Sequence, residues 1–181
     1  MPTVLVNGLP GAGKTTLARA LATHLRSPLF SKDAVKETLA DTLGPLRPAH
    51  CDDREWSRTL GTAAAETLWT LLAGAAGNAV LESPWLAHTR PFVRSGLRRA
   101  GITLVHEVWC EVPVDVARAR CTTRAAGRHP VHPERPGGHE GDWALWARGA
   151  RPLELGPVHR VDTTVPVDVG ALAAAIGTPR H

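Results

Sequence analysis

Residue types that would indicate several classes of protein are scarce in this chain of 181 residues. It contains no tyrosine, two phenylalanines and three cysteines, which are Cys51, Cys110 and Cys121. The cysteines form no C-x-x-C pair and are odd in number, so free thiols in a reducing cytoplasm are expected rather than a disulfide framework. Most of the aromatic residues are six tryptophans, which we expect to lie mainly in the core.

The chain also lacks segments that would target it to a membrane or to nucleic acid. No basic region followed by an apolar run opens the sequence, and no stretch reaches transmembrane length, so a cytoplasmic protein is expected. The net charge of +4 suits an anionic ligand such as ATP, but the basic residues are dispersed rather than clustered. Nucleic acid is therefore disfavoured as a partner, and a small hydroxylated molecule is favoured.

No linker, internal repeat or low-complexity tail divides the chain. We expect residues 1–181 to form a single domain with a full hydrophobic core, as a monomer or a homodimer. Residues 125–141 contain many turn residues and no period, which predicts a mobile lid.

Apolar strand-like runs alternate with helix-like runs along the sequence. This alternation predicts an α/β fold, a three-layer sandwich in which a five-stranded parallel sheet carries helices on both faces. Strands are expected at 3–7, 28–30, 78–82, 103–110 and 158–162. Helices are expected at 14–26, from 32–33, and at 55–73, 89–100, 114–124, 140–149 and 168–176.

The most specific motif is the segment GLPGAGKT at residues 8–15, which fits the phosphate-binding pattern G-x-x-x-x-G-K-[ST]. It follows an apolar run and precedes a helical pattern, so its backbone N–H groups and the helix N-terminus can face phosphates. Lys14 supplies a charge for the β- and γ-phosphates, and the Thr15 hydroxyl can bind Mg²⁺. The predicted nucleotide-binding residues here are Gly8, Pro10, Gly11, Ala12, Gly13, Lys14, Thr15 and Thr16.

Ligands of open parallel sheets gather at the carboxyl ends of the strands, where two acidic residues are candidates. Asp33 follows the second strand, and its carboxylate can accept the proton of an attacking hydroxyl. Alternatively, Asp33 or Ser31 caps the following helix. Glu82 ends the third strand and can hold Mg²⁺, or it can make a structural hydrogen bond. Trp85, just beyond, either joins the core or walls a substrate pocket.

Arginines near the predicted lid form a third group of candidates. Arg120 and Arg124 share one face of a predicted helix, and Arg128 continues into the lid. Such groups can clamp a transferring phosphoryl group, or they can form a solvated basic face. The histidines around Arg128 match no zinc template, so a metal role for them is disfavoured.

These motifs, in this order, resemble those of small P-loop kinases grouped around chloramphenicol phosphotransferase, zeta toxin and polynucleotide kinase. The resemblance is carried by Gly8–Thr15, Ser31–Asp33, the Arg120/Arg124 pair leading into Arg128–Pro130, and Val161–Thr163. It implies transfer of a phosphoryl group from ATP to a hydroxyl, with Asp33 as general base and lid arginines among Arg120, Arg124 and Arg128. It also implies that Asp162 and Thr163 lie near the adenine.

The acceptor is left open, because the Ala-rich stretch between Asp33 and Glu82 carries no recognisable substrate motif. An antibiotic, nucleoside types included, is suggested by analogy alone. A polynucleotide or nucleotide-sugar kinase is one alternative. Another is a regulatory NTPase without an acceptor, since Asp41–Gly44 fits D-x-x-G, although no N-K-x-D motif accompanies it. The sequence does not distinguish ATP from GTP.

Overall fold

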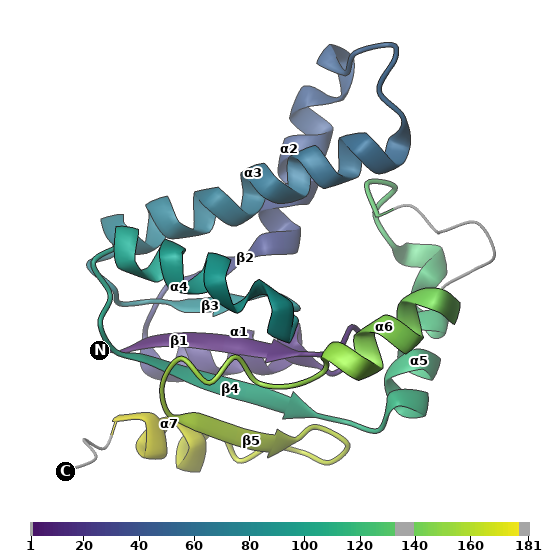
Figure 1. The fold of residues 1–181 in the computed structure, drawn as a ribbon. Coiled ribbons are helices and arrows are strands. Elements are labelled where there is room, and N and C mark those ends of the chain that lie inside the picture. The colour runs from purple at the N-terminus through teal and green to yellow at the C-terminus, as the bar shows by residue number, and fades with distance from the viewer. Residues whose placement is uncertain (1, 133–139, 178–181) are drawn as a thin grey trace.

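The centre of the molecule is a parallel sheet with the strand order β2-β3-β1-β4-β5 (Figure 1). The computed structural model describes residues 2–132 and 140–177. Its strands are β1 (Thr3–Gly8), β2 (Leu29–Ser31), β3 (Val80–Glu82), β4 (Val105–Glu111) and β5 (Val158–Asp162). Every neighbouring pair is parallel, so all five carboxyl ends open on the same edge.

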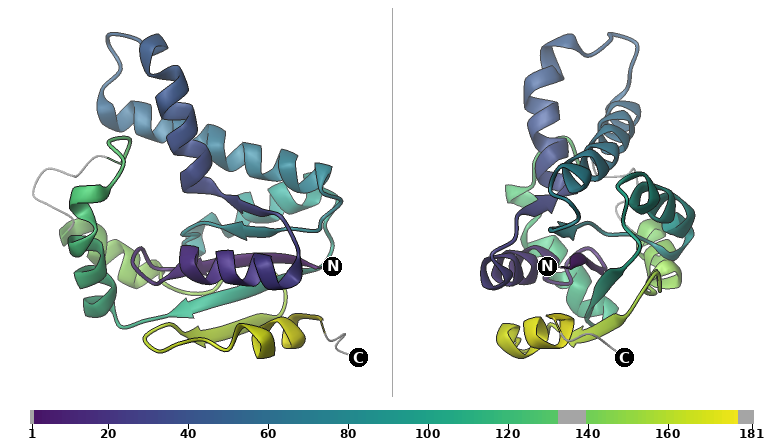
Figure 2. Two further views of the ribbon diagram at one scale, coloured as in Figure 1. Left: turned by 180° about the vertical axis from the view of Figure 1, so that it is seen from behind. Right: turned by 90° about the vertical axis from the view of Figure 1, so that its left-hand side faces the viewer.

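Helices cover both faces of the sheet (Figure 2). On one face lie α1 (Lys14–Leu25) and α7 (Val169–Gly177), and on the other α3 (Asp53–Gly74) and α4 (Arg90–Arg99). Side chains of β1 alternate between these layers, as the period of a strand requires. Val4 and Val6 are buried against the α1–α7 layer, whereas Leu5 is buried against the α3–α4 layer.

Two groups of helices flank the carboxyl edge of the sheet. The helix α2 (Lys32–Leu43) and the start of α3, which crosses it, extend beyond the sheet, and the 3₁₀ turn η1 (Gly44–Leu46) lies between them in the chain (Figure 1). On the other side lie α5 (Val114–Thr123), the turn η3 (Ala125–Gly127) and α6 (Glu140–Gly149). A further 3₁₀ turn, η2 (Ala87–Thr89), leads into α4.

The predicted fold class is confirmed, with shifts at several element boundaries. The third strand starts at Val80 rather than residue 78, because the Asn78 N–H bonds to the Ala75 carbonyl in the turn after α3. The fourth strand starts two residues later than expected, at Val105. The predicted lid at 125–141 lies partly outside the described residues, so the lid remains a prediction. No helix in the described ranges is both long and apolar enough to cross a membrane.

Candidate active site

The phosphate-binding loop depends on glycines at positions that no other residue fits. Gly8, Gly11 and Gly13 all have positive φ angles, of 146°, 83° and 76°. A Cβ on Gly11 would overlap the Ala117 carbonyl of α5, and one on Gly8 would lie 2.8 Å from the Cys110 carbonyl. The loop is therefore pressed against β4 and α5 by close backbone contact.

The N-terminus of α1 meets the conditions for binding an anion. Gly13 occupies the N-cap position without a side-chain hydrogen bond, and the first turn of α1 holds no acidic residue. The first N–H groups of the helix are therefore not satisfied by a cap, and the helix dipole favours negative charge there. Ala12 is buried and its N–H bonds to the Leu9 carbonyl at 3.0 Å, which closes the turn of the loop.

Lys14 lies folded over this loop. Its Nζ donates a hydrogen bond to the Leu9 carbonyl at 2.9 Å, and its side chain is buried. Burial lowers the pKa of Lys14, while the nearby carboxylates of Glu82 and Asp33 act in the opposite direction. The ammonium group is therefore already placed where a nucleotide's phosphates would meet the loop.

Glu82 brings together two hydroxyl groups, one from the first turn of α1, which follows β1, and one from the end of β2. The Thr15 Oγ1 lies 3.4 Å from Glu82 Oε1, and the Ser31 hydroxyl donates to Glu82 Oε2 at 2.7 Å. This contact arises because β3 lies between β1 and β2 in the sheet. A carboxylate and two hydroxyls form an all-oxygen donor set, which fits Mg²⁺.

Asp33 lies in the first turn of α2, beside this cluster. The N-cap of α2 is Ser31, but no side chain caps the helix, because the Ser31 hydroxyl is bonded to Glu82. The capping alternative is therefore not what the structure shows. The carboxylate of Asp33 is close enough to Lys14 and to His132 to counteract the lowering of their pKa values by burial. Asp33 thus lies between the phosphate loop and the pocket described below.

A pocket of about 720 Å³ opens on one side of the loop. Arg120 Nη2 donates a hydrogen bond to the Thr163 carbonyl at 3.1 Å. This bond links α5 to the segment after β5, and both line the pocket. Asp162 is not among the lining residues; its carboxylate instead accepts hydrogen bonds from Thr164, which lower its pKa. The lining is mostly apolar, and it includes Gly11, Gly13, Thr16, Arg120, Arg124, Thr163, Val165, Pro166 and Val167.

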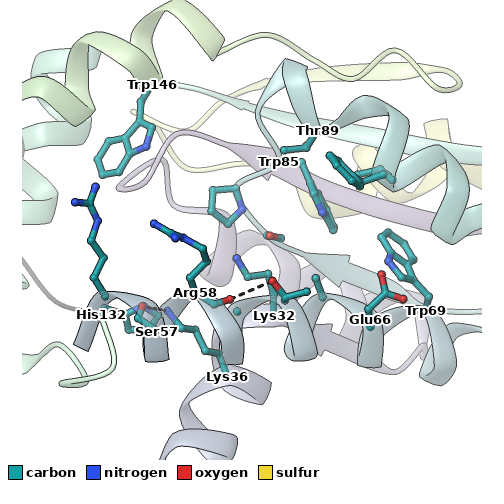
Figure 3. A pocket seen from close by; sticks show the side chains of 18 of the residues that line it. Lys32, Lys36, Ser57, Arg58, Glu66, Trp69, Trp85, Thr89, His132 and Trp146 are labelled. Atoms are coloured by element: carbon teal, nitrogen blue, oxygen red, sulfur yellow. Dashed lines mark hydrogen bonds between the residues drawn. The ribbon is translucent and has the colours of Figure 1, made fainter. Parts of the chain in front are cut away.

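A larger pocket of about 1030 Å³ opens on the other side, between α3, α4 and the strand ends (Figure 3). Trp85 lines this pocket and is also buried, so both roles considered for it are combined. Basic side chains lie toward one end of the pocket in Figure 3, and Trp69 and Trp85 toward the other. The lining includes Lys32, Lys36, Ser57, Arg58, Trp69, Ser83, Trp85, Thr89, Phe92, Arg128, His132 and Trp146.

The three predicted lid arginines divide between the two pockets. Arg120 and Arg124 line the smaller one, whereas Arg128 lines the larger one. The segment after Arg128 is attached to α2, since His129 Nε2 lies 3.0 Å from Asp41 Oδ1 and His132 Nε2 lies 3.0 Å from Glu37 Oε1. Asp41, the first residue of the D-x-x-G match, lies near the end of α2 and pairs with His129 rather than with the loop.

Sequence reasoning missed a buried polar network beneath the site. Asn7 Oδ1 accepts the N–H groups of Gly8 and Trp85, at 2.7 and 2.9 Å, which ties the start of the phosphate loop to the wall of the larger pocket. Asn7 Nδ2 donates to the fully buried Glu107, whose carboxylate also accepts the Leu153 N–H. The available signal was a pair of polar residues inside otherwise apolar strands.

The strand order, the phosphate loop and the two layers of helices define the α/β P-loop kinase fold. Within it, the chain belongs to the family described as an AAA domain (AAA_33), whose model matches residues 4–135. The predicted resemblance to small P-loop kinases is thereby confirmed.

Two other proteins are similar to this chain in sequence. An uncharacterized protein of Mycobacterium tuberculosis, Rv2004c, is 29% identical over 170 residues, which cover 90% of this chain. The chain spans about a third of that relative, 32% of its length. Adenylyl-sulfate kinase of Myxococcus xanthus is 38% identical over 122 residues, covering 64% of this chain and 60% of the kinase.

Solved structures show the same fold. A Chloroflexus aurantiacus protein provisionally assigned as a kinase superimposes with a TM-score of 0.80 at 35% identity, covering 97% of this chain and 96% of its own. Chaetomium thermophilum Kti12, solved with ADP-AlF3, gives a TM-score of 0.63 at 17% identity over 97% of both chains. The tunicamycin resistance protein of Deinococcus radiodurans gives 0.55 at 20% identity, over 99% of this chain and 98% of its own. At these low identities, the last two matches indicate a shared fold and nothing more.

Proposed function

We propose that this protein transfers the γ-phosphate of ATP to a hydroxyl group of a small molecule. The observation that carries the proposal is the presence of two separate pockets, one lined by Gly11 and Gly13 of the phosphate loop and the other by residues after β2 and β3. Lys14, Glu82 and Asp33 interact at the same edge of the sheet. A kinase needs separate sites for donor and acceptor on either side of the transferred phosphoryl group, whereas a regulatory NTPase needs only the first.

In this proposal the smaller pocket receives the adenosine part of ATP, and the loop from Gly8 to Thr16 receives the phosphates. Thr15 and Glu82 would hold Mg²⁺, and the Ser31 hydroxyl, which donates a hydrogen bond to Glu82 Oε2, would orient that carboxylate. Bound there, the metal supplies positive charge to the β- and γ-phosphate oxygens. Lys14 and the arginines stabilise the charge that develops on the transferring group.

Asp33 acts as the general base. The acceptor hydroxyl gives its proton to the Asp33 carboxylate as its oxygen bonds to the γ-phosphorus, and the bond from that phosphorus to the β-phosphate oxygen breaks. ADP leaves, and the proton departs from Asp33 to water. An ATP-dependent reaction and free thiols favour a cytoplasmic location.

The acceptor class includes antibiotics, nucleoside types among them, as candidates. The similarity to adenylyl-sulfate kinase supports a small acceptor, since that enzyme is the sequence relative with the highest identity among those described above. A polynucleotide acceptor is less well supported, because the larger pocket is basic toward one end only and the basic residues of the chain are dispersed.

Transfer of labelled γ-phosphate into a panel of hydroxylated acceptors tests this function. The panel contains sugars, nucleosides, nucleotides, antibiotics and a 5′-hydroxyl oligonucleotide, each assayed with Mg²⁺ and with EDTA. Label in an acceptor, and ADP formed only in step with it, is the expected result. Label found only in inorganic phosphate, at the same rate with and without acceptors, would replace the kinase by a hydrolase.

A Glu82→Gln variant tests the metal site in the same assay. Because the amide keeps the shape but not the charge, we expect the Mg²⁺ concentration needed for half-maximal rate to rise about tenfold, with the ATP-binding loop intact. Glu154→Gln is the matched control, since Glu154 is exposed at the surface and remote from Thr15. An unchanged Mg²⁺ requirement would remove Glu82 from the metal site.

A further inference from the structure

One face of α3 forms the floor of the larger pocket along its length. The lining residues Arg54, Ser57, Arg58, Gly61, Ala65 and Trp69 recur at helical spacing. Arg58 and Trp69 are eleven positions apart, or about 16 Å at the helical rise. Between them lie the small residues Gly61 and Ala65, and the stem of Lys36 passes close to Gly61. The pocket is therefore elongated, with chemically different ends.

The end near Arg58 carries positive charge that the protein itself does not neutralise. Within residues 2–132 and 140–177, Lys32, Arg58 and Arg128 form no ion pair, although each lines the pocket. Lys36 is buried, and its Nζ donates to the Ser57 hydroxyl at 2.7 Å rather than to a carboxylate. Burial lowers the pKa of Lys36, and the charges of Lys32 and Arg128 lower it further.

The acidic residues that line the same pocket are already engaged. Asp52 caps α3, Asp53 pairs with Arg47, and Glu66 pairs with Arg99. Two more carboxylates lie close to the basic end. Glu37 contacts His132, and Asp33 is the proposed base. The basic end is thus suited to a ligand that brings its own negative charge.

The opposite end is mainly aromatic, although the carboxylate of Glu66, which pairs with Arg99, lies beside Trp69 (Figure 3). The rings of Trp69 and Trp85 are stacked, with centroids 6.4 Å apart, and both line the pocket. Phe92 also lines it and is 75% exposed, so its ring is accessible to a ligand in the pocket. Lys32 lies between the two ends in Figure 3 and directly precedes Asp33 in the sequence.

We propose that the acceptor is an elongated anionic molecule: a phosphate, sulfate or carboxylate group at the Arg58 end, an aromatic ring at the Trp69–Trp85–Phe92 end, and the accepting hydroxyl between them. This inference rests on the proposed function, because it assigns the larger pocket to the acceptor. A nucleoside monophosphate has this arrangement of groups, and so does an aryl glycoside phosphate.

Calorimetric titration in saturating Mg·ADP, which occupies the nucleotide pocket, tests the inference directly. The probes are uridine, its 5′-phosphate and its 5′-carboxylate, together with phenyl β-glucoside and its 6-phosphate. We expect each anionic probe to bind at least about tenfold more tightly than its neutral parent, the gain typical of charge-assisted hydrogen bonds. Equal affinity within each series, or no binding of any probe at millimolar concentration, would overturn the inference.

Three variants locate the two ends. Arg58→Gln should reduce the preference for anionic probes to less than about threefold, whereas Phe92→Ala should weaken neutral and anionic probes by the same factor. Arg98→Gln is the control, because Arg98 is exposed on α4 and does not line the pocket. If Arg58→Gln weakened neutral and anionic probes alike, its role would be structural and the inference would fail.

The transfer assay separates this inference from the proposed function. Transfer to neutral acceptors as efficient as transfer to anionic ones would preserve the kinase and contradict the inference. A preference for anionic probes in binding, with no phosphate transfer to any acceptor, would preserve the anion site and contradict the kinase.

Discussion

The proposed site has two halves, which are built in different ways: a nucleotide half, formed by the phosphate loop and the smaller pocket, and an acceptor half, formed by the larger pocket. The phosphate-binding part of the nucleotide half comes from one continuous segment, in which β1, the loop and α1 follow one another. The smaller pocket beside it also includes side chains of α5 and of the segment after β5. The acceptor half is assembled from side chains of α2, α3, the turn after β3, α4 and the segment after α5. Only the first construction leaves a fixed pattern in the sequence.

The physical reason is the kind of constraint that acts on each half. Gly11 cannot acquire a side chain without overlapping the Ala117 carbonyl, so the loop tolerates one shape. In the acceptor half, Arg58 and Phe92 are exposed, and nothing in the packing dictates them. We therefore expect the phosphate site to be determined by the sterically constrained loop. The identity of the acceptor should be determined by side chains of the larger pocket that packing leaves free to vary.

The largest expected effect comes from removing the charge of the nucleotide half. Lys14→Ala should lower phosphoryl transfer by at least about 1,000-fold, because no other described side chain hydrogen-bonds across the loop as Lys14 does. Steady-state transfer and nucleotide binding are both measured. Arg19→Ala, an exposed position on the same helix, is the control and should retain activity. A Lys14 variant with near-normal turnover would refute the assignment of the phosphate site.

The second prediction concerns Asp33, the proposed general base between the nucleotide half and the acceptor half, which is replaced in Asp33→Asn. Transfer should fall about 100-fold or more, the usual contribution of a general base, while the dissociation constant for ATP changes little. Asp115→Asn provides a matched control, because Asp115 is an exposed carboxylate in the first turn of another helix. Loss of ATP binding in step with activity would assign Asp33 to the nucleotide half instead.

The sequence predicted the fold and the position of the phosphate loop, whereas it did not predict which residues line the larger pocket. The fold class, the order of elements and the loop followed from hydrophobic periodicity and from one steric motif. Trp85 was identified as a possible pocket wall, because residues after a strand end face the ligand edge. By contrast, Arg58 and Trp69 lie in a helix whose sequence was notable only for its many alanines, so neither residue was predicted to line a pocket. Their shared face becomes meaningful only when α2, α4 and the strand ends enclose it.

Local sequence patterns were also insufficient to predict the positions of the lid arginines and the hydrogen bonds of Asn7. Helical spacing placed Arg120 and Arg124 together, but it did not show that Arg128 faces a different pocket. The hydrogen bonds of Asn7 join residues 78 positions apart in the chain, so no local pattern encodes them. Both features depend on how the strands are ordered, which periodicity alone does not specify.

Substitution of single arginines sharpens the division between the halves. Arg124→Gln should raise the KM for ATP about tenfold or more, with a smaller effect on the acceptor, since Arg124 lines the proposed nucleotide pocket. Arg128→Gln should do the reverse and raise the KM for the acceptor, since Arg128 lines the larger pocket. Each change removes about one charge-assisted contact, which corresponds to roughly 1.5–3 kcal/mol if the contact is direct.

The two variants control for each other, because both remove one guanidinium from the same region of the chain. Kinetic constants for both substrates are determined at saturation of the other. Identical effects of the two substitutions on both KM values would contradict the division of the arginines, and would indicate one shared clamp on the transferring phosphoryl group.

The smallest expected effect concerns pH and the contact between His132 and α2. Burial lowers the pKa of His132 below its ordinary value of 6.5, and the charges of Lys36 and Arg128 act in the same direction. The unfolded chain therefore binds a proton at this position more readily than the folded protein does. Stability should be unaffected above neutral pH and should decrease as the pH falls below about 6.5, until the lower folded-state pKa is reached.

Urea unfolding at pH 7.5, 6.5 and 5.5 measures this contribution. His132→Gln removes the titrating group, so its free energy of unfolding should decrease less between pH 7.5 and 5.5 than that of the wild type. His50→Gln is the control at an exposed position and should follow the wild type. If both variants lost stability in parallel with the wild type, the protonation of His132 would not oppose folding, and the acceptor half would not be the acid-sensitive part of the site.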